Sequence, residues 1–231
     1  MTSLANAHFD INELLYPGCL TDKWQMTESE RLGLTSILYR LCPRCAIEVG
    51  TYECGSLSLI AQFSTAVFSI DIDPSIPDRF RQFDNVTFLT GSSQVVLPLV
   101  LEELDRASLP PDLVLIDGDH SAAGVKRDME ILLDYAPKEP MVVLMHDSFN
   151  PECRRGLLET DWQRSPFVEW VDIDFIPGRV IEHGGGGDGE MWGGLALAHF
   201  SPTPRQSTLV VQATAARAFA EMRSIHYPAY T

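Results

Sequence analysis

The sequence has 231 residues, of which 45% are hydrophobic and 21% charged, a composition typical of a single globular domain with a sizeable core. Its net charge of −15 would repel polyanions, so DNA, RNA and anionic membranes are not expected partners. No apolar run approaches the roughly 20 residues that a membrane helix needs, and the N-terminal segment lacks the pattern of a signal peptide. We therefore expect a cytoplasmic protein. The five cysteines, an odd count, do not indicate a disulfide framework.

Helical and strand patterns alternate from residue 27 onward. The first helix, expected over 27–42, begins with a capping box formed by Thr27 and Glu30. Short and nearly continuous apolar runs indicate strands that are buried on both faces. Strands are expected at 45–50, 66–73, 85–91, 112–117 and 140–147, and helices between them at 56–63, 94–104 and 122–136. This alternation predicts an α/β fold with a doubly wound, mostly parallel sheet.

The rhythm changes after about residue 155. Two apolar segments, 166–178 and 191–200, have no helical pattern between them, so we expect an antiparallel pair of strands. The glycine run 184–187 in the connection is interpreted as a loop tip. Residues 203–225 are expected to form a C-terminal helix. No linker or internal repeat interrupts the chain, so residues 1–231 are interpreted as one domain.

Polar residues or glycine follow each of the five expected parallel strands. In a doubly wound sheet, ligands bind beyond the carboxyl ends of the strands. Five such ends in order indicate a ligand site much more strongly than any one of them. In chain order they carry Gly50, Asp71 with Asp73, Ser92 with Ser93, Asp117, and His146 with Asp147.

The glycine turn after the first strand departs from two common nucleotide motifs. Its spacing matches a phosphate loop, but Ser56 and Leu57 replace the required Lys and Ser/Thr, which argues against ATP or GTP hydrolysis. In the dinucleotide fingerprint, the second glycine lets the backbone approach a pyrophosphate. Tyr52 stands at this position, and its bulky side chain argues against NAD. A ligand without a pyrophosphate fits better, and a carboxylate such as Asp71 can accept hydrogen bonds from both ribose hydroxyls. The alternatives are an NAD(P)-dependent oxidoreductase and a plain tight turn before a helix.

The segments EVGTYECGS, SIDIDP, LTGSSQ, LIDGDHS and VLMHDSF, in this order, resemble the class I S-adenosylmethionine-dependent methyltransferases. Within that class they most resemble the small-molecule O-methyltransferases of the catechol and macrocin O-methyltransferase type, over about residues 24–200. The resemblance implies a Rossmann-like methyltransferase fold, S-adenosylmethionine as cofactor and a small-molecule hydroxyl as acceptor. Residues 1–26 are expected to form a lid over the cofactor. A catechol, a sugar or another natural product remains open as acceptor, and so does whether the protein is a homodimer.

The resemblance also implies which residues bind the cofactor. Glu48 and Gly50 match the turn that approaches its methionine part, and Ser56 matches a serine that contacts the methionine carboxylate. Tyr52, within the same turn, is a further candidate. Asp71 matches the acidic residue that holds the ribose hydroxyls. The residues that match positions beside the adenine are Ser93 and Gln94.

Asp117 matches a carboxylate that meets both the cofactor and a divalent metal, and His146 with Asp147 matches the pair that completes the metal site. Two departures from the family are visible. Cys54 stands where a glycine is usual, and we expect the neighbouring Gly55 to preserve the turn. His146 replaces an acidic residue, and Mg²⁺ prefers oxygen ligands whereas imidazole suits Mn²⁺ or softer ions such as Zn²⁺. Either the metal is softer than magnesium, or His146 is a base and no metal binds.

His120 has two interpretations. It follows the fourth strand close to the expected substrate opening, where a base with a near-neutral pKa would take a hydroxyl proton. Alternatively, Asp119 and Ser121 cap the next helix while His120 points into solvent. The candidate catalytic residues are therefore His120, Asp117 and His146. A catalytically silent S-adenosylmethionine-binding partner subunit, in which His146 is a relic of a lost metal site, is the remaining alternative.

Overall fold

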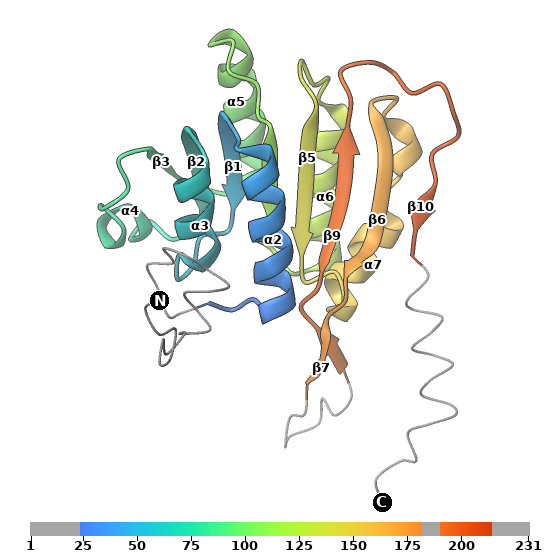
Figure 1. Ribbon diagram of the computed structural model, residues 1–231, viewed down its shortest axis with the longest axis horizontal. Helices are drawn as coiled ribbons and strands as arrows, with labels where there is room; N and C mark the ends of the chain where they lie inside the picture. The colour runs from blue at the N-terminus through green and yellow to red at the C-terminus, as the bar shows by residue number, and fades with distance from the viewer. Residues whose placement is uncertain (1–23, 182–189, 214–231) are drawn as a thin grey trace, which may run out of the picture.

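The computed structural model describes residues 24–181 and 190–213, and its centre is an eight-stranded sheet (Figure 1). The strands are β1 (Cys45–Val49), β2 (Ala66–Asp71), β3 (Val86–Thr90), β4 (Leu113–Ile116), β5 (Met141–His146), β6 (Val168–Ile176), β9 (Leu195–Phe200) and β10 (Val211–Gln212). Their order is β10-β6-β9-β5-β4-β1-β2-β3. Strands β1 to β5 are parallel, whereas β9 is antiparallel to both β5 and β6. The predicted mostly parallel sheet with an antiparallel C-terminal pair is confirmed.

Helices cover both faces of the sheet. They are α2 (Glu28–Leu41), α3 (Gly55–Phe63), α4 (Ile76–Arg79), α5 (Ser93–Arg106), α6 (Ala122–Asp134), α7 (Pro151–Glu159) and the 3₁₀ turn η1 (Trp162–Arg164). Alternate residues of each parallel strand face opposite layers, so Ile47 packs with α5, α6 and α7 while Ala46 packs with α2 and α3. Burial on both faces explains the continuous apolar runs of these strands. No helix in the described part of the chain has the length and apolarity needed to span a membrane.

Several elements differ from the sequence-based expectation. The connection between β6 and β9 contains a two-stranded hairpin, β7 (Arg179–Ile181) and β8 (Glu190–Trp192), and α4 and α7 were not anticipated. The predicted C-terminal helix is wrong over residues 203–213, where Val211 pairs with Val171 as part of β10. Pro202 and Pro204 disfavour helical backbone before this point. Residues 214–225, the glycine run and most of the expected lid lie outside the described residues.

The strand order reverses between β1 and β4, which is where a doubly wound sheet binds ligands. Val49 pairs with Ile116 in this register, so Gly50 and Asp117 emerge side by side. The amide of Asp117 donates to the carbonyl of Val49 at 2.8 Å. Gly50 has φ +89°, and a Cβ there would overlap the carbonyl oxygen of Asp117. Only glycine therefore allows these two loops to approach so closely.

Candidate active site

A cleft opens at the carboxyl ends of the parallel strands and consists of two cavities that share Gly50, Tyr52 and Asp117. The larger cavity, of about 420 Å³, extends toward the ends of β2 and β3. The smaller one, of about 40 Å³, lies against the start of the described chain. Other residues that line the larger cavity include Asp71, Ile72, Arg79, Ser93 and Gln94, and those of the smaller one include Trp24, Met26, Thr51 and Ser56.

Asp71 shapes the turn after β1 as well as lining the larger cavity. One carboxylate oxygen, Oδ2, accepts hydrogen bonds from the amides of Thr51 at 2.8 Å and Tyr52 at 3.1 Å. The other, Oδ1, accepts from the amide of Asp73 at 2.8 Å. Tyr52 has a left-handed backbone with φ 46°, and its side chain is exposed at the mouth of the cleft. The carboxylate of Asp71 therefore joins the β1 turn to the β2 end.

Glu48 lies beneath the turn and lines neither cavity, although it was a candidate cofactor contact. Its fully buried carboxyl group accepts a hydrogen bond from the Ser56 hydroxyl at 2.6 Å. Burial raises the pKa of Glu48 to about 8, and the hydrogen bond from Ser56 only partly offsets this. The turn is completed by Cys54, which has φ 67° and directly precedes α3. The expectation that Gly55 would preserve the turn is wrong, because Cys54 itself adopts the left-handed conformation.

The predicted adenine-side residues, Ser93 and Gln94, both line the larger cavity at the start of α5. The Ser93 hydroxyl donates to the buried carboxyl group of Asp128 at 2.7 Å. Burial raises the pKa of Asp128 to about 6. Sequence analysis missed Arg79, which lines the same cavity from α4 and pairs with Glu53 at 3.1 Å.

Asp117, His146 and Asp147 come together where β4 and β5 end. Nδ1 of His146 lies 2.9 Å from Oδ1 of Asp117 and 3.8 Å from Oδ2 of Asp147. One potential ligand atom from each of the three residues falls within a set that spans no more than 4.8 Å. Asp147 has a left-handed backbone with φ 56°, and its Oδ1 accepts from the amide of Gly193 at 2.8 Å. The three predicted metal ligands are therefore adjacent.

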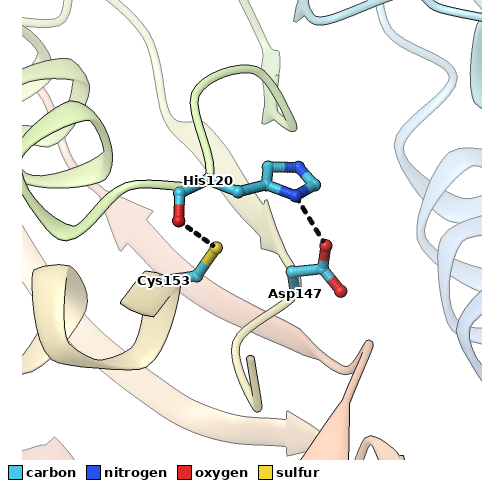
Figure 2. A group of neighbouring side chains, drawn as sticks. All are labelled: His120, Asp147 and Cys153. Atoms are coloured by element: carbon cyan, nitrogen blue, oxygen red, sulfur yellow. Dashed lines mark hydrogen bonds and ion pairs between the residues drawn. The ribbon is translucent and has the colours of Figure 1, made fainter. Parts of the chain in front are cut away.

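His120 lies over this cluster and does not point away from it. Its Nε2 is 3.3 Å from Oδ1 of Asp117, and its Nδ1 is 3.1 Å from Oδ2 of Asp147. Figure 2 shows the ring turned toward Asp147, while the thiol of Cys153 donates to the His120 carbonyl at 3.5 Å. Asp119 accepts from the amide of Ser121, and Ser121 caps α6 by accepting from Gly124. The capping interpretation holds for Asp119 and Ser121, whereas His120 faces the carboxylates.

Glu30 is the site residue that sequence analysis missed. It is fully buried, and its Oε1 lies 3.5 Å from Nε2 of His146. It forms the predicted capping box with Thr27, and it also accepts a hydrogen bond from the amide of Gly194. In the sequence, the capping box already explains a glutamate at position 30. Nothing in the sequence therefore indicated its contact with His146.

The electrostatics of the cluster follow from these contacts. Burial raises the pKa of Asp117, but His146 and His120 outweigh this and hold it at about 2. Burial disfavours the charged form of His146, yet Asp117, Glu30 and Asp147 raise its pKa well above the ordinary value. The hydrogen bond to Asp117 raises the pKa of His120. The carboxylates thus favour the protonated form of both imidazoles.

The donor set fits a divalent cation. Bonds of about 2.0–2.2 Å from a metal to nitrogen and oxygen allow two ligand atoms of one ion to be up to about 4.4 Å apart. The 2.9 Å and 3.8 Å separations around Nδ1 of His146 lie within this limit. Two carboxylates and one imidazole suit Mn²⁺ or a softer ion better than Mg²⁺. A second group, His120, Asp147 and Cys153, shares Asp147 with the first.

Comparison with known proteins is consistent with this geometry. Residues 47–148 match a family model described as a methyltransferase domain. No curated protein matches the chain. The fold resembles a proposed O-methyltransferase of Klebsiella pneumoniae, with 15% identity over 80% of this chain and 84% of that one and a TM-score of 0.51. An O-methyltransferase of Bacillus cereus, solved with SAH, is 15% identical over 83% of this chain and 86% of that one, with a TM-score of 0.49.

The sheet and the cleft at its switch point are consistent with this match, in which residues 47–148 are similar to a methyltransferase domain. The matched residues run from the middle of β1 to the residue after Asp147, so they include the strand ends that line the cleft. The match favours a methyltransferase over the alternative of an NAD(P)-dependent oxidoreductase.

Proposed function

We propose that the protein methylates a hydroxyl group of a small molecule and that a divalent metal assists it. The observation that carries the proposal is the position of Asp117. Its side chain lines both cavities of the cleft and also contacts His120 and His146. The cavity proposed for the cofactor and the cluster proposed to accept a proton and bind a cation therefore meet at the carboxylate of Asp117. Methyl transfer to oxygen needs this juxtaposition, since the acceptor must be both aligned and activated.

The larger cavity is assigned to the nucleoside of S-adenosylmethionine, which supplies the methyl group as a sulfonium. Asp71, Ser93 and Gln94 line this cavity, and its volume of about 420 Å³ lies within the range typical of small-molecule sites. Gly50 and Ser56 line the smaller cavity, which is assigned to the methionine part. This division follows the family resemblance, which implies that Gly50 and Ser56 contact the methionine part and that Asp71, Ser93 and Gln94 contact the nucleoside.

The start of the described chain is proposed to close over the methionine part. Trp24 and Met26 are buried and line the smaller cavity together with the β1 turn. The guanidinium of Arg31 lies 5.2 Å from the centroid of the Trp24 ring, which connects this segment to α2. The segment thereby excludes water from the cavity, and it is the described end of the expected lid.

Activation of the acceptor is assigned to His120 and to the neighbouring cluster. His120 is partly exposed beside the cleft and can take the proton of the hydroxyl as its oxygen attacks the methyl carbon. Asp147 would hold the imidazole by accepting from Nδ1, so that Nε2 takes the proton when Asp117 is engaged by the metal. A divalent ion held by Asp117, His146 and Asp147 would supply a Lewis acid that lowers the pKa of the hydroxyl.

The acidic surface is consistent with a small acceptor. With a net charge of −15, the protein disfavours an anionic polymer as substrate. We propose a neutral or catechol-like hydroxyl compound, with catechols and sugars as the first classes to test.

Calorimetry with S-adenosylmethionine, SAH and NAD, followed by an assay of SAH release, tests the proposed function. We expect micromolar binding of the first two, no binding of NAD, and SAH release with at least one hydroxyl acceptor from a panel of catechols and sugars. Absence of binding by S-adenosylmethionine and SAH would overturn the proposal. Binding without SAH release in Mn²⁺, across catechols, sugars and other natural-product alcohols, would favour a silent cofactor-binding subunit.

A further inference from the structure

His146 is held between carboxylates on opposite sides of its ring. Nδ1 faces Asp117 at 2.9 Å, whereas Nε2 faces Glu30 at 3.5 Å. Within the described residues, Nε2 is buried and makes no hydrogen bond of good geometry, so Glu30 is the carboxylate available to it. A buried imidazole nitrogen without a partner is costly. The residue that faces Nε2 therefore has a strong influence on the state of this ring.

Glu30 is fixed in position by two segments of the fold. Its carboxylate accepts from the amide of Thr27 at the start of α2 and from the amide of Gly194 before β9. A Cβ on Gly193 would lie 2.6 Å from Oε1 of Glu30, and Gly193 has φ 74°. The side chain of Glu30 is fully buried. Its carboxylate is therefore a rigid acceptor, not a mobile surface charge.

A carboxylate accepts hydrogen bonds and cannot donate them when ionised. Facing Glu30, Nε2 of His146 must carry its proton, and the lone pair of the neutral ring then resides on Nδ1. Nδ1 is the nitrogen that lies beside Asp117 and Asp147. Histidine ligands commonly donate their second N–H to a carboxylate, which fixes the tautomer and strengthens the ligand.

We propose that Glu30 is a positioning residue that keeps the proton of His146 on Nε2 and so presents Nδ1 as a metal ligand. This inference rests on the metal site of the proposed function. It gives a reason why a histidine can replace the acidic residue usual at this position. The carboxylate is retained in the site, but it comes from α2 and lies behind the imidazole. It also connects the lid-bearing start of α2 to the metal ligands.

The variant Glu30→Gln tests the inference because it changes one oxygen to NH₂ with little change in shape. Glutamine is accepted in a capping box. The capping box keeps the glutamine oxygen on the amide of Thr27, so the NH₂ group replaces Oε1. There it faces Nε2 of His146 and favours a proton on Nδ1, and it also loses the hydrogen bond from the amide of Gly194. We expect calorimetry with Mn²⁺ to show binding that is weaker by about 10- to 100-fold, the usual effect of removing the hydrogen-bond partner of a metal ligand. SAH affinity should stay unchanged, because Glu30 lines neither cavity.

Glu28→Gln is the matched control, since it makes the same chemical change at an exposed position in the first turn of the same helix. It should bind Mn²⁺ like the wild type. A second measurement does not depend on how well any variant folds. Nitrogen-15 spectra of the wild type loaded with Zn²⁺ should show His146 protonated at Nε2 and coordinated through Nδ1.

The outcomes separate this inference from the proposed function. Equal Mn²⁺ affinity of wild type and Glu30→Gln, or a Zn²⁺-loaded His146 protonated at Nδ1, would overturn the role of Glu30 alone. A wild type that binds SAH but no Mn²⁺ or Zn²⁺ would overturn both the metal site and the role of Glu30, leaving the methyltransferase assignment intact. A wild type that binds the metal but not SAH would overturn the proposed methyl transfer only.

Discussion

Oδ1 of Asp117 and Nδ1 of His146 lie 2.9 Å apart although the residues are 29 positions apart in the sequence. They end the adjacent parallel strands β4 and β5, whose register aligns Ile116 with Met145. Parallel pairing therefore places the next residue of each strand at the same edge of the sheet. This contact joins the cleft, which Asp117 lines, to the cluster of histidines and carboxylates.

Replacing His120 should remove the proposed base without affecting the cofactor cavity. We expect His120→Gln to lower kcat by about 10²- to 10⁴-fold, the typical contribution of a general base. SAH affinity, measured by calorimetry, should remain within twofold, because His120 lines neither cavity. His199→Gln is the control, since it makes the same change in β9 at a residue that lines neither cavity. Retention of more than half of the wild-type kcat by His120→Gln would exclude the base role.

Chelation should abolish turnover if a metal activates the acceptor. We expect EDTA to stop SAH release and added Mn²⁺ to restore it. Asp147→Asn should lose metal affinity while keeping the fold, because asparagine tolerates the left-handed backbone found at this position and can accept from Gly193. Asp147→Ala should likewise lose activity. Full activity after exhaustive chelation would instead assign proton transfer to the histidines alone.

Gly50→Ala should damage the cleft more than the rest of the protein. Its Cβ would overlap the Asp117 carbonyl, and φ +89° is unfavourable for alanine. We expect at least a tenfold loss of SAH affinity and a lower melting temperature by thermal unfolding. Gly33→Ala is the control, because Gly33 lies in α2, lines neither cavity and has no positive φ. Equal SAH affinity of both variants would show that the close approach of the two loops is not needed.

The buried carboxyl group of Glu48 should make the stability of the ligand-free protein fall with rising pH. Its pKa is about 8 in the folded protein against an ordinary value of 4.5, so between these values the folded state binds the additional proton. The free energy of unfolding must then decrease as the pH rises from 4.5 to 8. Glu48→Gln removes this titration and keeps an acceptor for the Ser56 hydroxyl.

The melting temperature of Glu48→Gln relative to the wild type should therefore increase between pH 5 and pH 9. A change of about 10 °C is expected, since the shifted pKa amounts to about 4 kcal/mol over this pH range and 1 kcal/mol shifts a protein of this size by about 2–4 °C. Ser58→Ala, in the same helix as Ser56, should show no such pH-dependent difference. A constant difference between Glu48→Gln and wild type across this range would contradict the elevated pKa.

The sequence predicted the strands and the set of residues at their ends well, because parallel strands buried on both faces leave a clear apolar pattern. The pattern placed Asp117, His146 and Asp147 at one edge of the sheet, where the ends of parallel strands meet, and the family resemblance grouped them as metal ligands. The C-terminal helix was wrong over residues 203–213, where pairing at the sheet edge outweighed a helical pattern. Cys54 shows a similar limit, because its left-handed backbone follows from the packing of the turn and not from its type.

By itself, then, the sequence determined the α/β class, the methyltransferase resemblance and the polar strand ends, all of which depend on local pattern and on strand order. Only the tertiary structure decided the orientation of His120 and the contact of Glu30 with His146. His120 was equally compatible with solvent until the ends of β4 and β5 placed two carboxylates beside it. Glu30 had a sufficient local explanation as a capping residue. Its contact with His146 exists because chain folding brings the start of α2 to the end of β5.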